Sequence, residues 1–182
     1  ISLGQGDFTI DGNGGIRTTP LLGSTLTLSG LSVYTGPTLV DTGTLKAGVA
    51  TTGANGAFGN NSAVTLANVA GVFLDITGFN NTIGSLSGGG TTGGSVILGS
   101  ATLAAGGNNE NTTFSGTLIN ANAAAGGAGV LTKTGTGTQT LTGANTYTGA
   151  TTIHGGTLVL TGATQATTAI TFTGGSADVS HT

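Results

Sequence analysis

Apolar and polar residues alternate along short stretches of this chain, and clusters of glycine and asparagine separate those stretches. Alternation with a period of two residues is typical of a β-strand with one buried face. The segments AVTLANV, VFLDI, TIGSL and SVILGSATL are predicted strands, with NN, GFNN and GGG turns between them. A strand about every ten residues predicts a β-solenoid with two or three strands per coil.

The same pattern extends to the N-terminal region, and no segment has the period of an amphipathic helix. Phe8 and Ile10 alternate with polar residues before DGNGG, which predicts a strand and a bend. The DGNGG segment also has part of the pattern of a calcium loop, but such a loop needs more oxygen ligands, so a turn is favoured. Residues 121–129, ANAAAGGAG, are too short and too rich in glycine for a helix, so we expect a flexible turn or a bulging loop there.

In a solenoid, the inward apolar side chains stack in columns from coil to coil, and each contributes about 1.5–3 kcal/mol. The expected members are Leu28, Val64, Leu66, Phe73, Ile76, Ile83, Leu86, Ile97, Leu103, Phe114, Leu141, Ile153 and Leu158. Thr occupies every second position from Thr132 to Thr142, so an extended chain would place six hydroxyls on one face. We interpret that face mainly as the solvent side of the strands.

The most regular segment is residues 129–160, GVLTKTGTGTQTLTGANTYTGATTIHGGTLVL. It resembles the passenger-associated repeat of Gram-negative autotransporter proteins, whose pattern is roughly G-x-L-x-K-x-G-x-G-x-x-x-L-x-G-x-N-x-Y-x-G-x-T-x-I/V-x-x-G-x-L. The matching positions are Gly129, Leu131, Lys133, Gly135, Gly137, Leu141, Gly143, Asn145, Tyr147, Gly149, Thr151, Ile153, Gly156 and Leu158. We expect structural roles for these residues.

Residues 25–48 form a second, less complete copy, offset by 113 residues. Lys133 and the paired glycines before it have no counterpart there, whereas Tyr34 and Gly36 correspond to Tyr147 and Gly149. Internal repetition of a strand and turn unit is typical of a solenoid, and an offset of this size corresponds to about five coils of roughly 20–25 residues.

The resemblance implies an all-β fold, a right-handed parallel β-helix that forms a single elongated domain over residues 1–182. It further implies a segment of a longer passenger, linked in the full-length protein to an outer-membrane barrel and located extracellularly, on the bacterial cell surface or secreted. The start at Ile1 without Met agrees with such a segment. The implied function is structural or adhesive, with the repeats supporting export and folding. The expected partners are a host or biofilm glycan or protein, and further copies of the chain, bound end to end or through the faces of the β-helix.

Composition supports a regular β-structure and excludes several classes of function. Charged residues are only 5% of the chain, yet 36% of residues are hydrophobic and mean hydropathy is +0.29, unlike a disordered protein. The three basic residues cannot form a phosphate-binding patch, so no nucleic-acid partner is predicted. Cysteine is absent, which excludes disulfides and thiol chemistry.

Two other functions of β-solenoids are alternatives. A polysaccharide-processing enzyme needs carboxylates that meet, and the near-equal spacing of Asp41, Asp75 and Glu110 is the best case, although it does not fit whole coils. We therefore predict no enzyme, catalytic residue, cofactor or metal site. An ice-binding solenoid needs a Thr-x-Thr pair in every coil, whereas the long threonine run lies in one segment.

The tyrosines, the histidines and the turn asparagines each allow a structural and a functional or alternative structural interpretation. Tyr34 and Tyr147 are expected to pack over turns rather than contact a sugar, and His154 and His181 are expected on the surface. The turn asparagines either adopt left-handed backbone geometry, which we favour, or form amide ladders between coils. These asparagines are Asn55, Asn60, Asn61, Asn80, Asn81, Asn108, Asn109 and Asn111.

Overall fold

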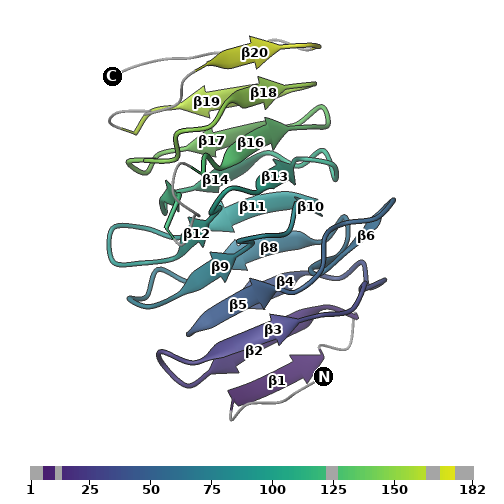
Figure 1. The fold of residues 1–182 in the computed structure, drawn as a ribbon, viewed down its shortest axis with the longest axis vertical. Coiled ribbons are helices and arrows are strands. Elements are labelled where there is room, and N and C mark those ends of the chain that lie inside the picture. The colour runs from purple at the N-terminus through teal and green to yellow at the C-terminus, as the bar shows by residue number, and fades with distance from the viewer. Residues whose placement is uncertain (1–5, 11–13, 122–126, 163–168, 175–182) are drawn as a thin grey trace.

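The computed structural model describes residues 6–10, 14–121, 127–162 and 169–174. The chain winds into an elongated stack of about seven coils, with its N-terminal strands at one end and its C-terminal strands at the other (Figure 1). The parallel β-solenoid predicted from the alternating pattern is confirmed, and the described ranges contain no helix. The right-handed winding stays a prediction. Residues 11–13 of DGNGG, residues 122–126 of the 121–129 loop and His181 fall outside the described residues.

Three sheets form the sides of the solenoid, here named sheets I, II and III. Sheet I contains β1 (Gly6–Ile10), β2 (Ile16–Pro20), β4 (Thr38–Val40), β8 (Ala63–Leu66), β11 (Ser85–Gly88), β14 (Thr112–Phe114), β17 (Thr138–Leu141) and β19 (Thr157–Leu160). Sheet II contains β3 (Thr25–Leu28), β5 (Thr44–Ala47), β9 (Phe73–Asp75), β12 (Ser95–Ile97) and β15 (Leu118–Ile119). Sheet III contains β10 (Asn81–Ile83), β13 (Thr102–Ala105), β16 (Val130–Lys133), β18 (Thr151–Ile153) and β20 (Ile170–Phe172).

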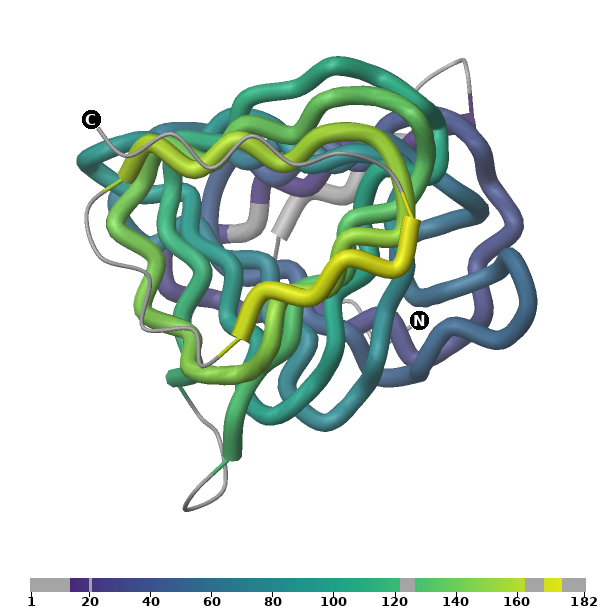
Figure 2. The backbone as a smooth tube through the Cα atoms, turned by 90° about the horizontal axis from the view of Figure 1, so that it is seen from above, coloured from purple at the N-terminus to yellow at the C-terminus, as the bar shows by residue number. Residues whose placement is uncertain are grey.

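From β8 to β17 the chain visits sheets I, II and III in turn, and these strands pair in parallel from coil to coil; after β17 the described coils have strands in sheets I and III only. Only the hairpins β1–β2 and β6 (Asn55–Gly56) with β7 (Gly59–Asn60) are antiparallel among the named strand pairs. The first two coils have no strand in sheet III, and their segments extend farther sideways than the later coils (Figure 2).

The core consists of columns of side chains that stack along the solenoid axis. In sheet II the column runs through residues that are at most 8% exposed: Leu26, Leu45, Leu74, Val96 and Leu118. In sheet I it runs through Val40, Leu66, Gly88, Phe114, Leu141 and Leu160. Because backbone groups pair between coils and side chains pack between coils, each coil is stabilised by stacking on its neighbours.

Two of the expected core residues face the other side of sheet II. Leu74 and Val96 are completely buried in the core column, so Phe73 and Ile97, their neighbours in the strands, point outward. Phe73 is accordingly partly exposed. The core prediction was wrong for Phe73, because VFLDI has apolar residues at adjacent positions and alternation alone cannot choose between the two faces, whereas Ile97 is buried, with 8% exposed.

Candidate functional site

The two repeat copies lie on different sides of the solenoid. In the first copy, β3 and β5 belong to sheet II and β4 to sheet I; in the second, the equivalent strands β17 and β19 belong to sheet I and β18 to sheet III. Four full coils and two further sides separate β3 from β17, somewhat less than the five coils expected. Outward side chains of the two copies therefore face different directions.

Each copy closes one coil on itself. Thr25 of β3 pairs with Thr44 of β5, and Thr138 of β17 pairs with Thr157 of β19, so both coils return to the same sheet after 19 residues. Coils between the copies are longer: Thr38 pairs with Val64 and Thr44 with Phe73. Each repeat thus contains a short coil, together with the two strands that pair with each other when that coil closes.

The repeated tyrosines have packing positions with a common hydrogen bond. Tyr147 is completely buried and its hydroxyl lies 2.5 Å from the hydroxyl of Thr151. Tyr34 is partly buried and its hydroxyl lies 2.8 Å from that of Thr38. Burial raises the pKa of Tyr34 to about 12 and also raises the pKa of Tyr147, although each hydrogen bond acts in the opposite direction. Tyr147 therefore has no surface for contact with a ligand.

The glycines of the second copy occupy turns and close contacts between coils. Gly129 precedes β16, Gly135 and Gly137 form the corner before β17, and Gly156 precedes β19. Gly135 and Gly156 both have a φ of 66°, a conformation that glycine adopts without strain. A Cβ atom at Gly143 would overlap the carbonyl oxygen of Gly116, and one at Gly149 would overlap that of Gly129. In the first copy, the Gly36 carbonyl accepts a hydrogen bond from the Ser62 hydroxyl at 2.6 Å.

Asn145 replaces a strand on the sheet II side of the sixth coil. It is completely buried; its Oδ1 accepts a hydrogen bond from the Leu118 backbone N–H at 2.9 Å, and its Nδ2 donates to the Gly143 carbonyl at 3.0 Å. The Asn145 amide therefore hydrogen-bonds the backbone at the edge of β15, where sheet II has no strand in the next coil. The apolar positions of the repeat, Leu131, Leu141, Ile153 and Leu158, are buried in the core, as is Thr151.

Lys133 is buried, with 1% of its surface exposed. Its ammonium group donates hydrogen bonds to the carbonyl oxygens of Thr134, Gly135 and Gly155. Burial lowers the pKa of Lys133, since the charged form loses contact with water. A signal for this burial was available in the sequence, because Lys133 alternates with core residue Leu131 on the same side of the strand.

Some of the turn asparagines have left-handed backbone geometry, and others form hydrogen bonds between coils. Asn61 and Asn109 have positive φ angles of 55° and 65°. Several amides also join neighbouring coils, but they bind backbone N–H groups rather than other amides: Asn80 accepts from Thr102 at 2.8 Å and Asn111 from Thr138 at 2.7 Å. Amide ladders would have required matching asparagines in successive coils.

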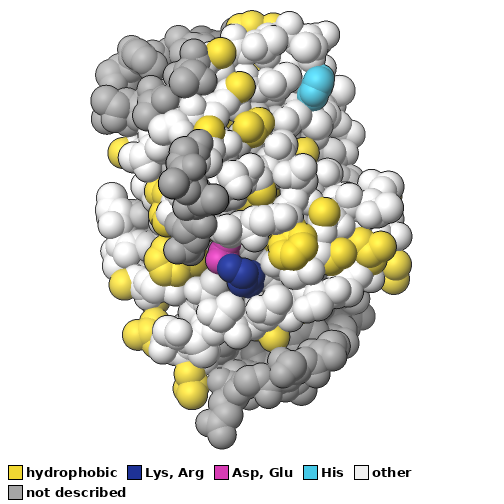
Figure 3. All heavy atoms as spheres, viewed as in Figure 1, with side chains coloured by type: hydrophobic (Ala, Val, Ile, Leu, Met, Phe, Trp, Pro, Cys, Tyr) yellow, Lys and Arg dark blue, Asp and Glu magenta, His cyan; other side chains and the backbone are white. Residues whose placement is uncertain are grey.

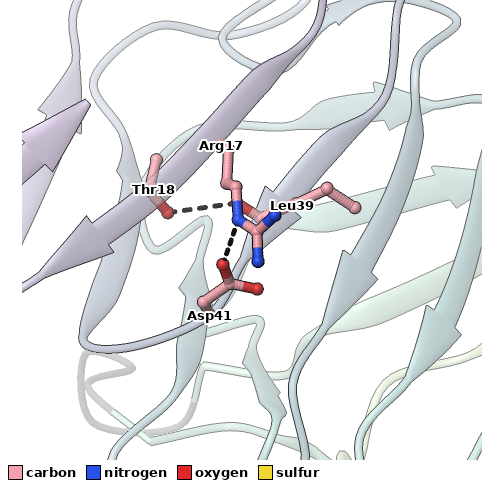
Figure 4. A network of polar contacts seen from close by, with 4 residues as sticks. All are labelled: Arg17, Thr18, Leu39 and Asp41. Atoms are coloured by element: carbon pink, nitrogen blue, oxygen red, sulfur yellow. Dashed lines mark hydrogen bonds and ion pairs between the residues drawn. The ribbon is translucent and has the colours of Figure 1, made fainter. Parts of the chain in front are cut away.

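Charged side chains are sparse on the face shown in Figure 3, where a basic side chain lies beside an acidic one. Lys46 of β5 donates to Asp75 of β9 at 2.8 Å, and Arg17 of β2 pairs with Asp41 beside the Thr18 to Leu39 hydrogen bond (Figure 4). Burial raises the pKa of Asp75, but hydrogen bonds from Lys46 and Thr77 outweigh it, so the pKa lies below its usual value.

The three carboxylates considered for catalysis do not meet. Glu110 binds the Ser85 hydroxyl and the Asn108 amide, whereas Asp41 and Asp75 have the basic partners given above. In the described ranges there is no group of three His, Cys, Asp or Glu residues that could hold a metal ion, and no helix that could span a membrane. His154 is exposed and its Nδ1 contacts the Thr173 hydroxyl.

The alternating threonines do not share one face. Thr132 belongs to β16 in sheet III, whereas Thr138 and Thr140 belong to β17 in sheet I, because the chain turns a corner at residues 134–137. In sheet III, the outward pairs Thr132/Thr134 and Thr171/Thr173 are separated by Thr152/His154 in the intervening coil. The uninterrupted Thr-x-Thr array that ice binding needs is therefore not formed by these strands.

Comparison with known proteins agrees with this geometry. The model of the Passenger-associated-transport-repeat family matches residues 23–47 and 131–160, and each range contains one of the two self-closing coils. The chain carries two passenger-associated transport repeats. It is also 48% identical over 65 residues to the adhesin BmaC autotransporter of Brucella suis biovar 1 (strain 1330), a match that covers 36% of this chain and 2% of that protein. No solved structure matches the chain.

Two segments of the chain are thus similar to the passenger-associated transport repeat, and about a third of the chain is similar to part of an autotransporter adhesin. The chain spans a very small part of its curated relative's length. The side chains that the two repeats share lie mostly inside the solenoid or in its corners, so the similarity of the repeats reflects how a coil closes.

Proposed function

We propose that this chain is a structural, adhesive segment of a passenger displayed on or released from the bacterial surface, and that its repeats support export and folding. The role is non-enzymatic. Host or biofilm glycans or proteins, and other copies of the passenger, are the proposed partners, and an outer-membrane translocator in the full-length protein is the proposed route of export.

One observation carries the proposal for the repeats: each contains two strands, β3 and β5 or β17 and β19, that pair with each other across 19 residues. Closing a short loop loses less chain entropy than closing a long one. A self-closing coil can therefore form as soon as its own residues have emerged, without waiting for a distant partner. Each new coil then buries apolar side chains on the previous one, which opposes backward movement of the chain.

The test removes one coil at a time from the full-length surface protein. Deletion of residues 138–156 removes one coil of the second repeat and joins Gly137 to Thr157, so the strands on either side can still stack. Deletion of residues 82–103 is the control, since it removes one coil outside the repeats and joins Asn81 to Ala104 in the observed register. Surface display is measured by labelling intact cells and by accessibility to external protease.

We expect the repeat deletion to reduce display more strongly than the control deletion. Equal display of the two deletion variants would contradict the role of the repeats in export. Adhesion is tested separately, by binding of purified passenger to a glycan array and to host cells. Absence of binding, together with normal display, would leave a scaffold role and remove the adhesive one.

A further inference from the structure

Lys133 occupies a core column that is otherwise apolar. Within sheet III it stacks between Ala105 of the preceding coil and Ile153 of the following coil. Its neighbours are buried, and among the described residues no carboxylate forms an ion pair with it. A charged group in such a position is unfavourable unless its hydrogen-bonding capacity is satisfied.

The ammonium group lies where corners of three successive coils meet. It donates to the carbonyl oxygens of Thr134 and Gly135 in its own corner, the latter at 3.3 Å, and to Gly155 in the next corner, also at 3.3 Å. On the other side is Gly106 of the preceding corner, where a Cβ atom would lie 2.9 Å from Nζ. Three N–H donors therefore meet three carbonyl acceptors that belong to two coils.

We propose that Lys133 fixes the register in which the coil of β18 and β19 stacks on the coil of β16 and β17. Apolar columns and threonine faces alone define register weakly, because a shift by two residues keeps the same side of each strand inward. Such a shift would move the Gly155 carbonyl away and leave a buried ammonium with an unused donor. Lys133 thus acts chiefly by making alternative registers unfavourable, a role in specificity rather than in net stability.

The first repeat provides an internal comparison. Pro20 occupies the position equivalent to Lys133, so that copy has no amine in the corresponding corner. The hydrogen bonds among Tyr34, Thr38 and Ser62 connect its coil to the next one instead. Register control by a buried amine is therefore expected for the second copy alone.

Paired cysteines can report the register, since the natural chain contains none. Thr132 and Thr152 are direct partners in β16 and β18, so T132C/T152C should form the native disulfide. T132C/H154C reports a shift of two residues. Each pair is placed in the 182-residue chain with Lys133 and in the Lys133→Met variant, whose side chain has similar length and no donors. Lys46→Met, which removes a partly exposed amine from another sheet, is the control.

With Lys133 or with Lys46→Met, we expect the native pair to cross-link and the shifted pair to remain reduced. Lys133→Met should raise the yield of the shifted cross-link roughly tenfold or more, the factor expected for a hydrogen bond to a charged group. An unchanged ratio of shifted to native cross-link in Lys133→Met would overturn the proposal.

A second variant covers the case in which Lys133→Met does not fold. Lys133→Ala leaves space for a small cation, so methylammonium chloride should restore the native cross-link, whereas sodium chloride at the same ionic strength should not. The same cross-linking pattern in both salts would contradict the proposed contact between the ammonium group and the corner carbonyls.

Discussion

The Tyr-x-Gly-x-Thr hydrogen bond occurs in both repeats, and it can be tested with the same substitution at two positions. Tyr147→Phe removes one hydroxyl from a completely buried side chain and leaves the packing of the ring intact. The Thr151 hydroxyl, also buried, then loses its partner. A buried hydroxyl left without a partner costs about 1–3 kcal/mol, so the free energy of unfolding should fall by that amount.

Tyr34→Phe is the matched control. The Thr38 hydroxyl also contacts the Ser62 hydroxyl at 3.0 Å, so it keeps a partner when the tyrosine hydroxyl is removed. The expected loss is the net value of one hydrogen bond, about 0.5–1.5 kcal/mol. Addition of Thr151→Val to Tyr147→Phe removes the unpaired hydroxyl and should recover part of the stability.

The assay is urea unfolding of the 182-residue chain, followed by circular dichroism in the β-region, with thermal unfolding in parallel. For a chain of this size, each kcal/mol corresponds to a shift of roughly 2–4 °C in Tm. The reasoning is refuted if Tyr34→Phe destabilises the chain as much as Tyr147→Phe, or if Thr151→Val adds its full effect to that of Tyr147→Phe.

Three further predictions concern close packing and titration. Gly143→Ala should destabilise the chain by about 1–3 kcal/mol or more because its Cβ would overlap the Gly116 carbonyl, whereas Gly30→Ala, with open space around it, should be neutral or stabilising in the same urea titration. The pKa of Asp75 in the folded chain lies below its unfolded value of 3.8, so the stabilisation from its carboxylate is complete above pH 3.8 and is lost as the pH falls through the folded pKa. Asp75→Asn should remove this part of the acid dependence of the urea midpoint. The pKa of Lys133 in the folded chain lies below its unfolded value of 10.5, so between these two pKa values the unfolded chain binds more protons and the free energy of unfolding should rise with pH. This rise should be missing in Lys133→Met. Subtracting the pH profile of the variant from that of the natural chain cancels the tyrosine titrations that both share.

The sequence predicts the class of fold because every level of the pattern agrees. Alternating strands, glycine-rich corners and a second copy at residues 25–48 all require a solenoid. The side of the solenoid on which each copy lies was not predictable, because it depends on the summed lengths of the intervening coils. Those lengths vary with excursions such as the β6–β7 hairpin, which alternation does not reveal.

Individual residues show the same division between local pattern and tertiary context. The core positions Leu141 and Leu158 follow from alternation within a single strand. Asn145 has an ordinary turn sequence around it, and only the missing strand beside β15 makes its amide a replacement for backbone pairing. The contact between Lys133 and Gly155 likewise joins corners of two coils, so it could be found only once their stacking was known.

The paired strands of the first repeat lie in sheet II and those of the second repeat in sheet I, and this offset has a consequence for how repeats can be added to such a chain. A copy that closes its own coil carries its register within it, and it need not be in angular phase with earlier copies. Duplication by recombination then tolerates spacers that end after any whole side, about a third of a coil, instead of only after a complete turn. Successive copies offset in this way would place their outward faces, and the spacers between them, on different sides of the solenoid.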